Sequence, residues 1–511
     1  MPSSRRVTGR LAALLSLALL AGCAPSATVT SAPSDAVEGS SAPGSAAPSA
    51  PAEAVAPPVR WTDCGEGFLC GDLRVPKDYD DPSLGSLNVS MVRLPATDKA
   101  ARIGSLVMNP GGPGGSGVDF VRGGAGAFPN ALRKRFDLVG FDPRGVNSSS
   151  AIRCIDNLDG RAALDPSPDS KAEIKALADD ARAYAAACGS RNDQTLPYLS
   201  TEAVVRDLDL IRQAVGDEQL TYLGFSYGTL IGALYAERFP ERIRAMALDG
   251  AIDPSLGLKR FRADQAKAFE QALGHFLDDC AGDRDCWFYE GGRTKRAFDR
   301  LMAAIEKKAL PTPRARDRRT VGPGLAQSAV LGAMYSESSW PSLAAALALA
   351  KEGDGSLLLL ISDPFRGRKE NGSYSNQQDA YTANTCLDYP APTDVATYTE
   401  WAADLEDVAP HFAKQVAYND LTCAYWPIAA TGKPHKVSAP GAPPIVIVGS
   451  TGDPATPYAW SKALVQQLET STLVTREGEG HTGYLESPCV AEAVDEYLME
   501  LTVPKRGLTC D

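Results

Sequence analysis

Residues 220–239, LTYLGFSYGTLIGALYAERF, carry the strongest indication of the fold. The stretch opens with a mostly apolar run typical of a buried strand, and the residues after Gly228 favour a helix. Between the two, Gly224-Phe225-Ser226-Tyr227-Gly228 fits the nucleophile elbow, a tight strand-to-helix turn that lifts a serine hydroxyl above the end of a sheet. Glycine is needed at positions 224 and 228, two residues before and after Ser226, because this turn is crowded. The stretch therefore predicts an α/β protein with Ser226 at the end of a strand.

Strands and helices alternate on both sides of this turn. Apolar or alternating runs predict strands at residues 86–95, 103–108, 136–141, 220–225, 245–248, 444–448 and 472–475. Helical spacing of apolar residues predicts helices at residues 201–215, 227–239, 459–468 and 489–501. This alternation is typical of a mostly parallel sheet that is covered by helices on both faces.

The alternation stops between about residues 253 and 437. Helical periodicity dominates there, for example at residues 261–281 and 342–350. We therefore expect a large, mostly helical cap insertion over residues 255–436. It divides the α/β core into a first part, residues 59–254, and a second part, residues 437–511.

The N-terminus has the features of an export signal. Arg5, Arg6 and Arg10 precede an apolar stretch, residues 11–20, which is too short to cross a bilayer as a helix. These features predict a signal peptide over residues 1–22.

The signal ends in a sequence that resembles the bacterial lipobox, Leu20-Ala21-Gly22-Cys23. The resemblance implies cleavage before Cys23 and acyl chains on this residue, enough to anchor the chain stably; an ordinary signal peptide cut nearby is the alternative. Ala, Pro and Ser dominate residues 23–58. This composition lacks the large apolar groups that a packed domain needs, and it predicts a flexible tether.

The composition excludes several classes of protein. Hydrophobic residues make up 44% of the 511-residue chain and charged residues 22%, which is ordinary for a globular protein and excludes a chain that is disordered throughout or a multi-span membrane protein. The formal net charge is −12. Nucleic-acid binding needs a basic surface, so we expect no nucleic-acid partner.

The cysteines predict disulfides. Besides Cys23 the chain has an even number of them, as expected of a disulfide framework in an exported protein. They are Cys64, Cys70, Cys154, Cys188, Cys280, Cys286, Cys386, Cys423, Cys489 and Cys510. The sequence alone does not select among the possible pairings, and we expect neighbours along the chain to pair. The chain has no C-x-x-C pair, which argues against a zinc ribbon or a thioredoxin-type site.

A serine nucleophile needs a base, and the chain has four histidines. His481 follows the last predicted strand, where the Ser–acid–His order of elbow enzymes expects the base. His275 and His411 lie within helical stretches of the insertion, and His435 lies in a loop before the strand at 444–448. We therefore expect His481 to be the base.

The acid is expected between Ser226 and His481, at the end of a strand. Asp453 follows the strand at 444–448 and would accept a hydrogen bond from the histidine, which fixes the tautomer. Asp249 and Asp253, after an earlier strand, are the rivals, and turn formation or loop capping would explain them equally well.

The glycine-rich segment 109–117 follows a predicted strand and supplies the expected oxyanion hole. The two donors are assigned to the backbone N–H groups of Gly112 and Tyr227. A competing interpretation is a dinucleotide fingerprint, because Gly112, Gly114 and Gly117 fit G-x-G-x-x-G and Asp142 ends the next strand. A complete Ser–Asp–His set farther along the chain favours the oxyanion interpretation.

Taken together, six motifs resemble the exported tripeptidyl-aminopeptidase branch of the α/β-hydrolases, peptidase family S33. In chain order they are NPGGPGGSG, FDPRG, YLGFSYGT, LDGAIDP, GDPATPY and GHTGY. The resemblance implies the α/β-hydrolase fold, a Ser226/Asp453/His481 triad, a helical cap, and hydrolysis of peptide or ester bonds without a cofactor or metal. The lipobox and the length of the body resemble those of mycobacterial cell-envelope lipoproteins in this branch.

Family members release short peptides from free N-termini, which implies an acidic group in the cap that holds the substrate's ammonium. Asp388 and Glu270 are the candidates, although a solvated or capping carboxylate would look the same in the sequence. The resulting hypothesis is an aminopeptidase anchored through Cys23 to the outer face of the cytoplasmic membrane. A carboxylesterase acting on ester substrates is the alternative, and a non-catalytic solute- or peptide-binding lipoprotein is a further one.

Overall fold

The computed structural model describes residues 54–511. The predicted signal peptide, Cys23 and the predicted tether up to residue 53 lie outside the described residues. The last residues of the predicted tether contact the body, since the Ala56 N–H donates a hydrogen bond to the Gln213 side chain at 3.1 Å. Within residues 54–511 no helix combines the length and the apolar character needed to span a membrane.

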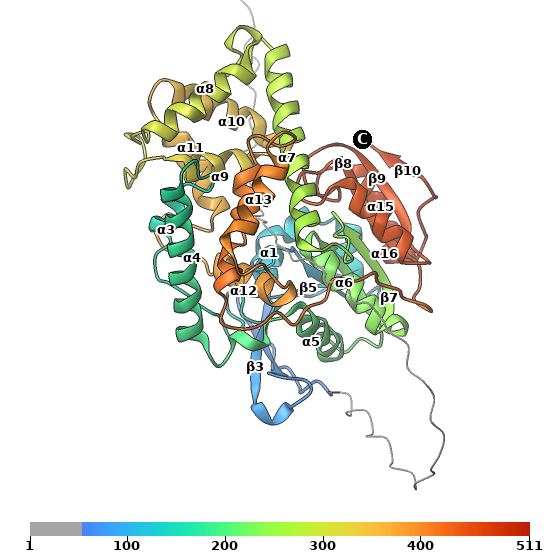
Figure 1. The fold of residues 1–511 in the computed structure, drawn as a ribbon. Coiled ribbons are helices and arrows are strands. Elements are labelled where there is room, and N and C mark those ends of the chain that lie inside the picture. Colours follow the sequence, from blue (N-terminus) through green and yellow to red (C-terminus); the bar gives the residue numbers. More distant parts are fainter. Residues whose placement is uncertain (1–53) are drawn as a thin grey trace, which may run out of the picture.

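Ten strands form one sheet (Figure 1). They are β1 Thr62–Asp63, β2 Leu69–Pro76, β3 Ser86–Leu94, β4 Gly104–Asn109, β5 Phe136–Phe141, β6 Leu220–Phe225, β7 Ile243–Asp249, β8 Ile445–Gly452, β9 Thr472–Glu479 and β10 Leu508–Cys510. Their order across the sheet is β1-β2-β3-β5-β4-β6-β7-β8-β9-β10.

The sheet is antiparallel at one edge and parallel elsewhere. β1, β2, β3 and β5 pair antiparallel, and all pairs from β5 through β4 to β10 are parallel. In the register of β4, Val107 lies beside Val139 on one side and Tyr222 on the other. The predicted α/β fold with a mostly parallel sheet is confirmed.

Helices cover both faces of the sheet, as the continuous apolar strands require. Val107 and Ile447 belong to the layer that packs against α5, α6 and α15, whereas Leu106 and Val446 belong to the layer against α1, α2 and α16. Adjacent residues of one strand thus point to opposite faces. These helices span α1 Gly117–Gly124, α2 Asn130–Arg135, α5 Thr201–Ala214, α6 Tyr227–Arg238, α15 Tyr458–Gln467 and α16 Pro488–Glu500.

The long connection between β7 and β8 forms the cap. Its helices are α7 Leu258–Gly282, α8 Thr294–Lys307, α9 Pro323–Ala333, α10 Trp340–Lys351, α11 Ser356–Phe365, α12 Gln377–Asp388, α13 Val395–Leu405 and α14 Ala413–Tyr418. Figure 1 shows them, yellow-green to orange, gathered on one side of the sheet. They enclose an apolar core of their own, which includes Phe269, Leu273, Phe298, Leu331 and Leu347.

A second segment, which the sequence did not predict, joins the cap. The connection from β5 to β6 carries α3, Asp159–Ala163, and the long helix α4, Lys171–Asn192, which lies beside the short helix η7, Leu421–Tyr425. A capping box between Ser170 and Glu173 starts α4. Its buried face consists largely of alanine, so hydrophobicity varies little around the helix and the sequence shows no helical periodicity there.

Five disulfides join neighbouring cysteines along the chain, the pairing that was expected. They are Cys64–Cys70, Cys154–Cys188, Cys280–Cys286, Cys386–Cys423 and Cys489–Cys510. The two widest closures, Cys154–Cys188 and Cys386–Cys423, span 34 and 37 residues and fasten α4 and α12. In the chain-entropy model each contributes roughly 4 kcal/mol.

Candidate active site

Ser226 occupies the turn between β6 and α6. Its backbone has φ 55° and ψ −120°, a strained conformation that non-glycine residues rarely adopt and that is typical of a nucleophile elbow. The Ser226 N–H donates to the carbonyl oxygen of Asp249 at 2.8 Å, which ties the elbow to the end of β7. A Cβ atom on Gly224 would lie 2.5 Å from the Gly228 carbonyl oxygen, so this turn has room only for glycine at position 224.

His481 and Asp453 form a buried pair. The Nδ1 atom of His481 lies 2.9 and 2.8 Å from the two carboxylate oxygens of Asp453. The carboxylate also accepts hydrogen bonds from the Ala455 and Thr456 N–H groups, the Thr456 hydroxyl and the Thr482 N–H. With this many donors its position is fixed, and it can orient the imidazole as a triad acid does.

The imidazole ring of His481 lies close to Gly250, the residue that follows β7. Phe225 pairs with Asp249 across the β6–β7 register, so Ser226 and Gly250 follow side by side. A Cβ atom on Gly250 would lie 3.1 Å from Cε1 of His481. The Nε2 atom is buried, and no group of residues 54–511 hydrogen-bonds to it. An unprotonated Nε2 in this place has its acceptor capacity free for a serine proton.

The glycine-rich segment 109–117 approaches the serine elbow closely. Gly111 and Gly112 have φ 96° and 122°, which favours glycine, and a Cβ atom on Gly111 would lie 3.0 Å from Cβ of Ser226 and 3.1 Å from the Tyr227 nitrogen. Within the described residues neither the Gly112 nor the Tyr227 N–H donates a hydrogen bond. These are the two donors predicted for the oxyanion hole.

The cap contacts three loops at this site, which we call the glycine loop (109–117), the acid loop (452–458) and the histidine loop (480–484). The carbonyl oxygen of Tyr335 accepts the His481 N–H at 2.8 Å, and the two rings meet edge to face at 5.4 Å. Gln265 donates to the Ala455 carbonyl at 2.8 Å. A Cβ atom on Gly114 would lie 2.5 Å from the carbonyl oxygen of Gln377, at the start of α12. No pattern in the sequence predicts any of these contacts.

Comparison with known proteins identifies the relatives of this chain. The family model described as TAP-like protein matches residues 409–510. Serine protease Hip1 of Mycobacterium tuberculosis is 39% identical over 477 residues, which cover 89% of this chain and 91% of that protein. Carboxylesterase B of the same species is 36% identical and covers 98% and 97%, and tripeptidyl aminopeptidase of Streptomyces lividans is 34% identical and covers 90% and 88%. The chain belongs to this α/β-hydrolase family. It is a serine hydrolase.

The hydrogen bonds of Asp142 argue against the dinucleotide interpretation of the glycine loop. The Asp142 carboxylate, which the dinucleotide interpretation assigns to a ribose, accepts hydrogen bonds from the Ser116 hydroxyl at 2.5 Å and the Val118 N–H at 3.2 Å. It also receives the Asn147 side chain and the Ser148 N–H. Burial raises the pKa of this carboxyl, and the hydrogen bonds from Ser116, Ser148 and Val118 oppose the shift. Asp142 therefore braces the start of α1, and its acceptor sites are occupied.

The rival acids have other partners. The Asp249 carboxylate accepts hydrogen bonds from the Gly483 N–H at 2.9 Å and the Tyr484 N–H at 2.8 Å. It therefore holds the backbone of the histidine loop in place. Burial raises the pKa of Asp249 to about 6. Asp253 binds the backbone and hydroxyl of Ser255.

The remaining histidines pair with carboxylates away from the elbow. His275 binds Glu479, His435 binds Glu237, and His411 binds Glu270 and Asp299. In the part of the chain that the structure covers, no group of histidine, cysteine or acidic side chains has the arrangement of a metal site.

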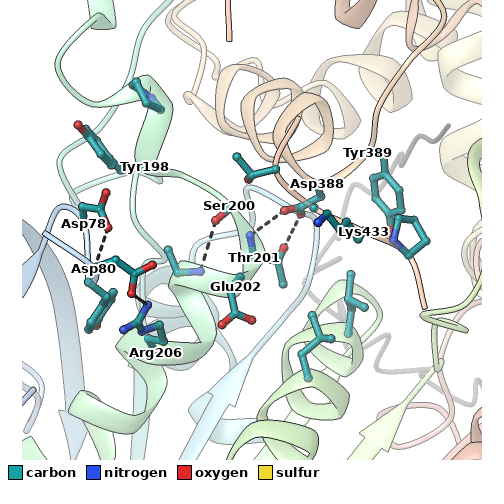
Figure 2. Close-up of a pocket in the computed structure, with 18 of the residues that line it drawn as sticks. Asp78, Asp80, Tyr198, Ser200, Thr201, Glu202, Arg206, Asp388, Tyr389 and Lys433 are labelled. Carbon is teal, nitrogen blue, oxygen red and sulfur yellow. Dashed lines mark hydrogen bonds and ion pairs between the residues drawn. The ribbon is translucent and has the colours of Figure 1, made fainter. Parts of the chain in front are cut away.

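The two carboxylates predicted to hold the substrate's ammonium lie in different places. Glu270 receives both the N–H and the Nδ1 of His411, at 3.0 and 2.6 Å. Asp388 ends α12 and accepts the N–H and the hydroxyl of Thr201 at 2.8 and 2.5 Å (Figure 2). It lines a cavity of about 640 Å³ between core and cap. Burial raises the pKa of Asp388 to about 7, and no cation of residues 54–511 forms an ion pair with it.

Proposed function

We propose that this serine hydrolase is an exported, lipid-anchored aminopeptidase that releases short peptides through an acyl-enzyme. Ser226, His481 and Asp453 are the proposed catalytic residues. The observation that carries the proposal is the buried His481–Asp453 pair, whose Nε2 has no hydrogen-bond partner within residues 54–511, at the carboxyl ends of the parallel strands that also carry the strained turn at Ser226. The relatives named serine protease and tripeptidyl aminopeptidase support the peptidase assignment.

In the proposed first half-reaction, Oγ of Ser226 attacks the scissile carbonyl carbon while its proton passes to Nε2 of His481. The carbonyl electron pair moves to the oxygen, where the N–H groups of Gly112 and Tyr227 stabilise the negative charge. The tetrahedral intermediate collapses, the C–N bond breaks, and the amine leaves with the proton from Nε2.

The second half-reaction hydrolyses the acyl-enzyme and regenerates the free serine hydroxyl. Water attacks the acyl carbonyl and gives its proton to Nε2, and the ester bond to Ser226 then breaks as Oγ takes that proton back. Asp453 stays ionised throughout, because its task is to orient the imidazole and to stabilise the imidazolium.

For the substrate's free N-terminus we propose Asp388 rather than Glu270. Asp388 lines a cavity and lacks a cationic partner within residues 54–511, whereas His411 engages both oxygens of Glu270. An arriving ammonium would ionise the Asp388 carboxyl, whose protonated form is favoured by burial. The Thr201 hydroxyl connects Asp388 to the phenol of Tyr227, next to the elbow.

Two further parts of the proposal concern location. The sequence motif at Cys23 supports a lipid anchor at the outer face of the cytoplasmic membrane. The five disulfides support export, because such bonds persist in oxidising compartments.

A carboxylesterase is the second candidate, because the relative named carboxylesterase B matches 98% of this chain. An acyl-enzyme serves both reactions, so the leaving group and the N-terminus of the substrate distinguish them.

The test combines a fluorophosphonate probe with a substrate profile. Wild-type protein is expected to be labelled at Ser226, and Ser226→Ala is expected to lose both label and turnover while keeping its melting temperature. Ser328→Ala, a buried serine of the cap, serves as the matched control and keeps both. Turnover by folded Ser226→Ala would overturn the assignment of the nucleophile. Faster cleavage of free than of N-blocked tripeptide amides supports the aminopeptidase, and a preference for short-chain esters over both supports the esterase.

A further inference from the structure

A chain of buried hydrogen bonds leads from the interior of the cap to the proposed catalytic acid. It starts at Arg262 on α7 and Asp420, just before η7, whose side chains are 2% and 3% exposed. Two parallel hydrogen bonds of 2.8 Å join the guanidinium to the carboxylate. This is the fork geometry in which arginine and carboxylate interact most strongly.

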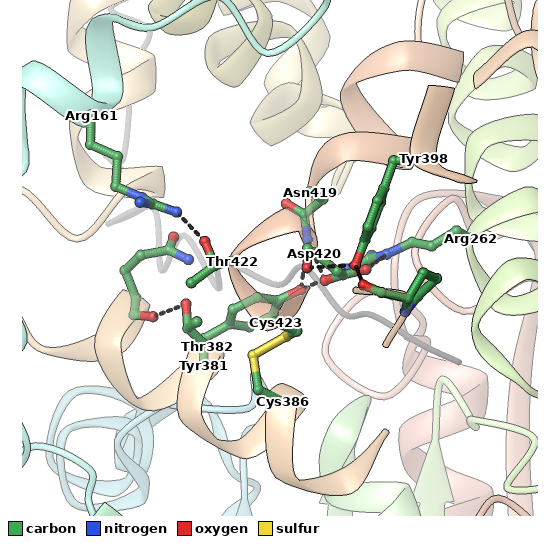
Figure 3. Close-up of a disulfide and its surroundings, with 12 residues drawn as sticks. Arg161, Arg262, Tyr381, Thr382, Cys386, Tyr398, Asn419, Asp420, Thr422 and Cys423 are labelled. Atoms are coloured by element: carbon green, nitrogen blue, oxygen red, sulfur yellow. Dashed lines mark hydrogen bonds and ion pairs between the residues drawn. A yellow bond between two sulfur atoms is a disulfide. The ribbon is translucent and has the colours of Figure 1, made fainter. Parts of the chain in front are cut away.

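Figure 3 shows how this pair is held in place. The Cys386–Cys423 disulfide fastens α12 to the segment that carries Asp420. The Tyr381 hydroxyl accepts hydrogen bonds from Arg262 at 2.9 Å and from Asn419 at 3.1 Å. The ion pair is thus braced from both of the helical segments that the disulfide joins.

The remaining guanidinium nitrogen, Nη1, is linked to the acid loop through the side chain of Gln265. It donates to Oε1 of this side chain at 2.7 Å, and Nε2 of Gln265 donates to the Ala455 carbonyl oxygen at 2.8 Å. Gln265 is 4% exposed. Because Arg262 has only donors, it fixes the amide with its oxygen toward the guanidinium and its nitrogen toward the acid loop.

The last link is a single peptide group. The carbonyl that Gln265 binds belongs to the peptide bond between Ala455 and Thr456, and the N–H of the same peptide donates to Oδ1 of Asp453 at 2.8 Å. All donors in this chain point the same way, from Arg262 to Asp453. Hydrogen bonds in such a series polarise one another and strengthen in a buried setting.

We infer that Gln265 is a positioning residue for the catalytic acid, set by the Arg262–Asp420 pair. It strengthens and aims the Thr456 N–H that holds the Asp453 carboxylate, so the cap contributes to the rate as well as enclosing the site. The inference rests on the proposed roles of Ser226, His481 and Asp453.

The decisive variant is Gln265→Glu. It keeps the shape and the bond from Arg262, but it replaces the donor toward the Ala455 carbonyl with an acceptor. We expect kcat and the rate of fluorophosphonate labelling to fall roughly tenfold, the equivalent of one lost hydrogen bond, while KM stays within about twofold. Gln265→Met, which loses both bonds, is expected to show the same loss of rate. Gln327→Glu, a cap glutamine that binds Ser167, is the matched control and keeps the wild-type rate.

A residue that merely fills space and satisfies Arg262 gives a different pattern. In that case Gln265→Glu retains the wild-type rate, because its volume and its bond to Arg262 are preserved. Wild-type rates in folded Gln265→Glu, or a rise in KM alone, would overturn the inference. Ser226→Ala, assayed in parallel, separates the two hypotheses: if it stays active, the proposed triad fails and the positioning role fails with it.

Discussion

The α/β core and the cap contribute to the site in physically different ways. The core supplies the proposed reacting groups through backbone geometry: a strained turn at Ser226, positive φ angles in the glycine loop, and loops that leave the ends of β8 and β9. The cap reaches the same three loops through single contacts, such as the Tyr335 carbonyl and the Gln265 side chain. The core therefore supplies the proposed reacting groups and the hydrogen bonds that hold the Asp453 carboxylate, whereas the cap adds contacts to the loops that carry them.

Two aspartates of the core, Asp453 and Asp249, test whether the core supplies the proposed reacting groups. Asp453→Asn is expected to lower kcat on the order of 10⁴-fold, because the amide no longer holds the imidazole in the correct tautomer. Asp249→Asn is the control, since within residues 54–511 the Asp249 carboxylate accepts hydrogen bonds only from backbone N–H groups of the histidine loop. This substitution is expected to cost about tenfold or less. Rates are measured with the best substrate of the profile on samples of equal melting temperature. Equal losses in the two variants would mean that Asp453 only supports the loop.

The same difference explains what the sequence could predict. The serine elbow, the glycine loop and the strand at 220–225 are encoded in consecutive residues, so local pattern was sufficient. β10 is too short for any pattern, and the alanine-rich face of α4 hides its helix. These elements become visible only once the chain has folded.

Contacts between distant segments were beyond prediction for a different reason. Tyr335 contacts His481, and Gln265 contacts the acid loop. Both contacts depend on how the cap helices pack after long connections. No spacing within the sequence encodes such a meeting. The sequence likewise placed Asp388 in the cap without revealing that Thr201 binds its carboxylate.

Two disulfides of the cap differ in the length of chain that they close and in their distance from the Arg262–Asp420 pair. Cys386–Cys423 closes 37 residues beside the Arg262–Asp420 pair, whereas Cys280–Cys286 closes 6 residues at the end of α7. Removing the first with two Cys→Ser substitutions is expected to cost about 4 kcal/mol of unfolding free energy and the second about 2 kcal/mol.

Guanidinium unfolding under non-reducing conditions measures this difference. Only the loss of Cys386–Cys423 is also expected to lower kcat of the folded enzyme, because it frees the segment that carries Asp420. Equal effects of the two double variants on stability and on rate would show that the position of a disulfide in the cap is immaterial to the site.

The pH dependence of stability at Asp388, where core and cap meet, is a smaller expected effect. Asp388 and Asp394 both bind the N–H of a helix start, Thr201 on α5 and Thr397 on α13, but Asp388 is buried and Asp394 is exposed. Burial raises the pKa of Asp388 to about 7. The hydrogen bond from the Thr397 N–H lowers the pKa of Asp394.

The two shifts give opposite slopes of stability with pH. A raised carboxyl pKa means that the folded state binds more protons, so the contribution of Asp388 is fully present below pH ~4 and is lost as pH rises to about 7. Between pH 5 and 8 wild type is therefore expected to lose about 2–3 kcal/mol relative to Asp388→Asn. Asp394→Asn instead removes a contribution that is present at neutral pH and is lost as pH falls through the lowered pKa of the folded state. Chemical unfolding of the three proteins measures both slopes, between pH 5 and 8 for Asp388 and below pH ~4 for Asp394. A wild-type curve parallel to that of Asp388→Asn between pH 5 and 8 would show that the buried carboxyl stays ionised.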